Sequence, residues 1–176
     1  MTSLLTLQDF VDYRGMSANI NFEKDLKKHV LDAQEFELRI FMGDPFFLAL
    51  VDDFNASPSL DTYSDLFITH RYTYDSKEYE SPGIKRLLVQ YAHARYIAAD
   101  GSTSTPYGYR NKRHDKSDKP DAKVVGRKSA KARSGATSYE DRIRLYLDRN
   151  SDMYPLWKCT YKKRTAGGGF KISAIG

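Results

Sequence analysis

The sequence predicts a mainly α-helical protein: a small bundle of four to five helices, a long basic arm or hairpin between the last two helices, and an extended C-terminal tail. Apolar residues recur at spacings of three and four in several stretches, which is the period of a buried helix face. A polar, basic segment interrupts this pattern after residue 100, and a glycine-rich stretch closes the chain. We expect one helical domain over residues 1–157, with the arm at 101–123, and a tail over 158–176.

Three helices are predicted in the N-terminal part. Thr6 can cap a short first helix. The second helix spans Phe22–Met42 and ends at Gly43. Its expected buried face consists of Phe22, Leu26, Val30, Ala33, Phe36 and Ile40. Asp44 is expected to cap the third helix, because a proline follows it at the first helical position.

A core helix is predicted over Ser81–Ala99, with Ser81 as its cap and Pro82 at its first position. Its apolar face is Ile84, Leu87, Leu88 and Tyr91. Residues 60–68 indicate a short helix or turn. The next segment, His70–Tyr79, alternates tyrosine and threonine with polar residues, so a strand and a loop both remain open.

The last helix is predicted over Val124–Asn150. Its clear apolar face is Tyr139, Ile143, Tyr146 and Leu147. Gly135 leaves its continuity open, because glycine weakens a helix interior. The segment Tyr154–Trp157 is interpreted as an apolar plug that follows the helix.

Charge is divided unequally along the chain. Residues 1–80 hold 7 Lys and Arg against 15 Asp and Glu, whereas residues 81–176 hold 21 against 8. Such asymmetry indicates a partner for the basic half. That partner is either nucleic acid or the acidic half of a neighbouring copy, and the second arrangement suits head-to-tail association into rings.

Two sets of residues are candidates for contact with partners. The first is the basic arm and the start of the last helix, which would face DNA or an acidic protein: Arg110, Lys112, Arg113, Lys116, Lys119, Lys123, Arg127 and Lys128. The second is a docking segment in the plug and the tail: Tyr154, Trp157, Lys162, Lys163, Arg164, Phe170 and Ile172. Charge alone does not separate the possible partners.

No residue pattern in the chain predicts catalysis, a cofactor or a metal site. The four histidines stand apart, and Cys159 is the single cysteine and has no identifiable base. The triple glycine at 167–169 lacks the context of a phosphate-binding loop. No apolar run approaches the roughly 18–20 residues that span a bilayer, so we expect no membrane partner.

The order of three motifs carries a family resemblance. They are "Gly-Ile-Lys … Tyr-Ala-His-Ala-Arg-Tyr" at Gly83–Tyr96, "Thr-Pro-Tyr-Gly-Tyr-Arg-Asn-Lys" at Thr105–Lys112, and "Tyr-Leu-Asp-Arg-Asn … Tyr-Pro-Leu-Trp" at Tyr146–Trp157. With the acidic helices before them, they resemble head-to-tail connector or adaptor (head completion) proteins of tailed bacteriophages, especially phages of Bacteroidetes hosts. The likeness covers most of residues 5–157 and leaves out the tail.

The resemblance implies a structural virion protein without enzymatic activity or cofactor. It implies a ring, usually of twelve copies, below the portal protein and above the next tail or collar ring, with genomic DNA passing through the lumen without sequence-specific contacts. It implies assembly in the bacterial host cytoplasm. Within this class a stopper, collar or tail-terminator ring remains an alternative. Outside it, the basic arm leaves open a small nucleic-acid-binding module.

Overall fold

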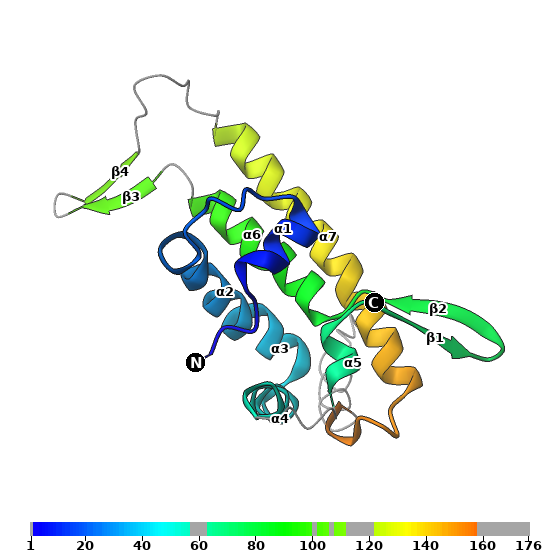
Figure 1. Ribbon diagram of the computed structural model, residues 1–176. Helices are drawn as coiled ribbons and strands as arrows, with labels where there is room; N and C mark the ends of the chain where they lie inside the picture. Colours follow the sequence, from blue (N-terminus) through cyan, green and yellow to red (C-terminus); the bar gives the residue numbers. More distant parts are fainter. Residues whose placement is uncertain (1, 57–62, 100–101, 106–107, 112–121, 158–176) are drawn as a thin grey trace, which may run out of the picture.

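The computed structural model describes residues 2–56, 63–99, 102–105, 108–111 and 122–157 (Figure 1). It confirms a mainly α-helical chain, and the described residues also form two short antiparallel hairpins. The elements are α1 (Leu7–Arg14), η1 (Phe22–Leu26), α2 (Lys27–Ala33), η2 (Gln34–Leu38), α3 (Arg39–Met42), α4 (Asp44–Asn55), α5 (Ser64–Phe67), β1 (His70–Tyr74), β2 (Lys77–Ser81), α6 (Ile84–Ala99), β3 (Ser102–Thr105), β4 (Gly108–Asn111) and α7 (Ala122–Arg149).

Helix α1 begins at the predicted cap. The Thr6 backbone N–H donates to Asp9 Oδ2 at 2.7 Å, and the Asp9 N–H donates back to Thr6 Oγ1 at 3.4 Å. This reciprocal pair satisfies N–H groups that have no partner within the helix. Asp9 also accepts a bond from Lys85 Nζ at 3.1 Å, which ties α1 to α6.

Residues 22–42 are helical throughout, but the predicted face is only partly right. Buried side chains recur at strict intervals of four: Leu26, Val30, Gln34, Leu38 and Met42. In an α-helix of about 3.6 residues per turn, each such step drifts about 40° around the axis. The wider π turns η1 and η2 absorb this drift. Phe36 and Ile40, which were expected inside, are therefore 57% and 56% exposed.

The junction between α3 and α4 corrects a second expectation. Gly43, with φ of +78°, occupies the cap position, and its carbonyl accepts the Phe47 N–H at 2.9 Å. Asp44 makes no cap bond. Its carboxylate instead accepts a 2.8 Å hydrogen bond from Arg39 Nε, and this lowers the pKa of Asp44.

Between α5 and α6 the chain forms a hairpin, so the strand alternative for His70–Tyr79 is correct. Asp75 and Ser76 form its turn with φ of +50° and +58°, the left-handed conformation that two-residue hairpin turns require. Ser81 was expected to cap α6, but this expectation is wrong, because Ser81 ends β2. The helix begins only at Ile84, after Gly83 turns the chain with φ of +76°.

Helices α6 and α7 lie side by side and run in opposite directions at the centre of the molecule (Figure 1). The Ser129 hydroxyl donates to the Ala94 carbonyl at 3.0 Å and fixes their register. Helix α7 continues without a break through Gly126 and Gly135, which settles the continuity that the sequence left open. Ile143, Tyr146 and Leu147 are buried as predicted.

The segment after α7 closes the core. The Trp157 ring lies 5.6 Å from the Phe41 ring between centroids, and its Nε1 donates to Asp148 Oδ1 at 2.8 Å. The Tyr154 hydroxyl lies 3.1 Å from that of Tyr146. The predicted apolar plug is therefore confirmed as part of the core.

Candidate functional site

The predicted contact residues fall into three groups. Lys123, Arg127 and Lys128 are exposed on α7, as a contact surface requires. Arg110 lies on β4, where only the backbone is described. The others of the basic set lie outside the described residues: Lys112, Arg113, Lys116 and Lys119.

The prediction of a docking segment is wrong for its first two residues. Tyr154 and Trp157 are 2% and 3% exposed, because both rings are buried in the core of their own chain. The remaining members lie outside the described residues: Lys162, Lys163, Arg164, Phe170 and Ile172.

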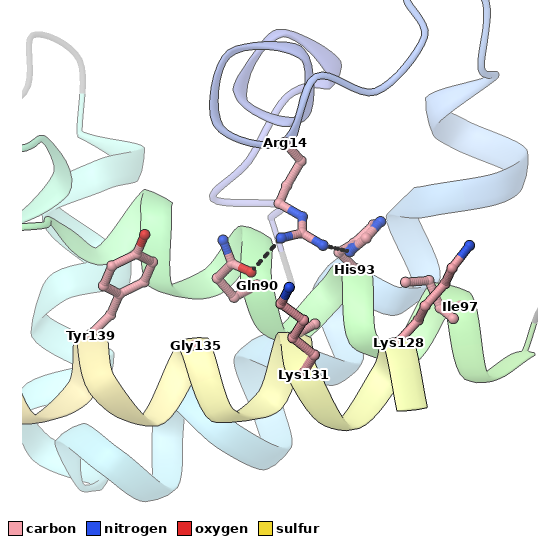
Figure 2. Close-up of a pocket in the computed structure, with 9 residues that line it drawn as sticks. Arg14, Gln90, His93, Ile97, Lys128, Lys131, Gly135 and Tyr139 are labelled. Atoms are coloured by element: carbon pink, nitrogen blue, oxygen red, sulfur yellow. Dashed lines mark hydrogen bonds between the residues drawn. The ribbon is translucent and has the colours of Figure 1, made fainter. Parts of the chain in front are cut away.

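A groove between α1, α6 and α7 is lined by cationic side chains that come from distant parts of the sequence. Its cavity volume is about 390 Å³. The small or apolar part of its lining is Ile97, Ala132 and Gly135, and no Asp or Glu among the described residues lines it. Figure 2 shows Arg14 reaching into the groove from α1, with Lys128 and Lys131 rising from α7.

Arg14 is held in place by neutral acceptors. Its Nη1 donates to Gln90 Oε1 at 3.1 Å, and its Nη2 lies 2.7 Å from His93 Nδ1 (Figure 2). Burial, aided by the positive charge of Arg14, lowers the pKa of His93 to about 4. His93 is therefore neutral at pH 7 and accepts the hydrogen bond from Arg14. The two neutral acceptors orient the guanidinium, and neither of them neutralises its positive charge.

The cations of α7 divide along the helix. In its second half, Arg142 pairs with Glu80 at 2.8 Å and Arg144 with Asp141 at 3.0 Å. The first half, residues 122–138, has five Lys and Arg and no acidic residue. Within the described chain, Lys128 and Lys131 make no ion pair, and both are exposed. Arg133 of this half pairs with Glu37 at 3.4 Å, so only Lys128 and Lys131 are named here as cations without a carboxylate partner among the described residues.

Two further cation clusters stabilise the fold. Arg95 forms a two-pronged ion pair with Glu37, with bonds of 2.8 and 2.9 Å. The Arg149 guanidinium lies 3.7 Å from the centroid of the Tyr79 ring and donates to the Tyr72 hydroxyl at 3.1 Å. This second contact holds the β1–β2 hairpin against α7.

Sequence reasoning found Lys128 but missed the residues that complete the groove. Lys131 follows Lys128 by three positions and therefore lies on the same helix face, which is a usable signal. Arg14, Gln90 and His93 carry no such signal, because 76 and 79 positions separate Arg14 from its two partners.

Among the residues that the structure describes, no group of three His, Cys, Asp or Glu is arranged to hold a metal ion. No helix in the described ranges has the length and apolar character needed to cross a membrane.

Residues 41–167 match the model of a family of unknown function (DUF6712). The chain belongs to this family. The match begins within α3, so all of α6 and α7 fall inside it, and Arg14 alone among the groove residues falls outside. No curated protein and no solved structure matches this DUF6712 chain.

Proposed function

We propose that this DUF6712 chain is a non-enzymatic structural protein of a tailed-phage virion. It forms a ring of identical subunits in the head-tail connector below the portal, joins the capsid to the tail, and lines the DNA channel. The resemblance of the three ordered motifs to connector and adaptor proteins is the observation that carries this proposal. The mainly helical architecture is compatible with it.

The placement of charge supports association between copies. Helix α4 carries the exposed carboxylates Asp44 and Asp52 and has no Lys or Arg. Lys128 and Lys131, which make no ion pair among the described residues, stand on the first half of α7. A subunit with acidic and basic surfaces on different elements can contact the next copy head to tail, and repetition of that contact closes a ring if the rotation permits.

The two hairpins support the same proposal. In Figure 1 the β1–β2 hairpin extends from one end of the helical body, and the β3–β4 hairpin lies beyond the other end. Each hairpin has only two strands, and a two-stranded hairpin by itself is at best marginally stable in water. Elements that reach away from a subunit are suited to contact with neighbours in a ring.

Oligomeric state tests the proposal directly. The purified full-length chain is examined by light scattering after size exclusion and by negative-stain electron microscopy, and particles are probed for the chain. We expect rings, alone or on addition of a portal protein. A chain that stays monomeric in both conditions and is absent from particles contradicts the proposal.

Deletion of residues 102–119 separates assembly from folding. The Ser129–Ala94 bond shows that the end of α6 and the start of α7 are adjacent, so the four residues left between them can join the helices. We expect a folded monomer that no longer forms rings. A deletion variant that unfolds would show that the arm belongs to the core.

A nucleic-acid-binding module is the second candidate function, favoured by Lys128 and Lys131 of α7, which make no ion pair among the described residues. Sequence-selective binding of duplex DNA at nanomolar concentration and physiological salt would favour a regulator, because specific readout greatly exceeds phosphate attraction. Weak binding that is independent of sequence fits a channel-lining protein.

A further inference from the structure

The groove between α1, α6 and α7 has the chemistry of an anion site. Three cationic side chains border it, and none of them pairs with a carboxylate among the described residues. Arg14 donates to Gln90 and His93, both neutral at pH 7, so its positive charge persists. A folded protein normally pairs or disperses such charge, because clustered cations repel one another.

Arg14 is also preorganised. The bonds to Gln90 and His93 hold its guanidinium at the mouth of the groove, so little side-chain entropy remains to be lost when an anion binds. A guanidinium retains further N–H groups after donating two bonds, and these match the geometry of phosphate oxygens. Lys128 and Lys131 lie across the groove on α7 and add two flexible ammonium groups (Figure 2).

The distribution of charge favours a long polyanion over a single small anion. Lys123, Arg127 and Lys131 follow one another at intervals of four on α7 and therefore lie along one side of the helix. No acidic residue interrupts this half of α7. The row leads from the groove toward the arm, and residues 101–136 together hold 10 Lys and Arg against 3 Asp.

We propose that the groove between α1, α6 and α7 binds the phosphodiester backbone of DNA, with Arg14, Lys128 and Lys131 as its phosphate ligands. Binding is independent of base sequence, because the groove offers charge and N–H donors to the backbone. The inference rests on the proposed function for the identity of the polyanion. It names the surface through which a channel-lining subunit would meet the passing duplex.

The test measures binding of a short fluorescein-labelled DNA duplex to the full-length chain by anisotropy over a range of salt concentrations. The variant Lys128→Gln/Lys131→Gln removes two groove cations at exposed positions. We expect on the order of tenfold weaker binding at low salt, and a plot of log K against log salt that is flatter by about 2. Arg14→Gln is expected to flatten the plot by about 1.

The matched control is Lys24→Gln/Lys28→Gln. Both lysines are exposed on η1 and α2, outside the groove, so this variant loses the same net charge. We expect its salt dependence to stay close to that of the wild type. An equal loss in the groove variant and the control variant would show that only net charge matters, and it would overturn the site. Absence of duplex binding by the wild type at low salt would also overturn it.

A glutamate-rich peptide distinguishes the other class of partner. If the wild type binds this peptide more tightly than the duplex, and the groove variant loses that binding, then the groove takes an acidic protein segment and the proposal fails. Electron microscopy of the same groove variant separates the two proposals. Rings that bind no DNA refute the inference alone, whereas a monomer that binds DNA through the groove refutes the connector role alone.

Discussion

Replacement of Gly83 by alanine is expected to damage the fold, because the added methyl group would meet backbone atoms. Gly83 joins β2 to α6 with φ of +76°. A Cβ there would lie 2.5 Å from both the carbonyl carbon and the carbonyl oxygen of Ile68, and 2.9 Å from the Phe67 oxygen. All three are backbone atoms, so no side chain can rotate away to make room.

Two costs add in Gly83→Ala. A positive φ costs a non-glycine residue about 1–2 kcal/mol. Overpacking that shifts a well-packed backbone costs about 1–3 kcal/mol. The sum, about 2–5 kcal/mol, is a large part of a typical domain stability of about 5–15 kcal/mol. At about 3 °C per kcal/mol for a chain of this size, Tm falls by about 10 °C.

Gly15→Ala is the matched control, measured in the same urea and thermal unfolding experiments by circular dichroism. Gly15 also has a positive φ, of +61°, but a Cβ there would meet nothing within 4 Å. It should show only the backbone cost, about 1 kcal/mol. Equal loss of stability in the two variants would refute the reasoning, since the clash with Ile68 would then contribute nothing.

Three further changes test other parts of the fold. Burial in the folded protein lowers the pKa of His93 from 6.5 to about 4, and the charged groups that line the same groove are Arg14, Lys128 and Lys131. The unfolded chain therefore binds a proton at His93 more readily than the folded chain does. The free energy of unfolding consequently falls as the pH drops below 6.5. Between pH 7 and 4.5 the wild type should lose about 2 kcal/mol more than His93→Gln in urea unfolding; equal loss would contradict the assignment. Gly126→Ala should stabilise α7 by about 0.5 kcal/mol in thermal unfolding, because nothing lies within 4 Å of the new methyl group and alanine favours a helix; a lower Tm would contradict this. Trp157→Ala should cost about 3–5 kcal/mol in the same assay, and a loss below 1 kcal/mol would exclude Trp157 from the core.

Features that depend on neighbours in the sequence were predicted well. The Thr6 cap, the apolar face of α7 and the plug that ends in Trp157 each follow from residues within a few positions of one another. Helix caps and 3.6-residue periodicity are local in this sense, so the sequence contains the whole signal. The Ser81 cap failed because a β-hairpin takes up the residues that would have begun the helix.

The candidate site shows the same division. The sequence by itself determined the charge split between the two halves and placed Lys128 on an exposed basic stretch. Only the tertiary structure decided that Phe36 is exposed, because the π turns change the number of residues per helical turn. No sequence motif predicts these turns. Only the tertiary structure brought Arg14 to His93, because these residues lie 79 positions apart in the sequence and meet only when α1 packs against α6.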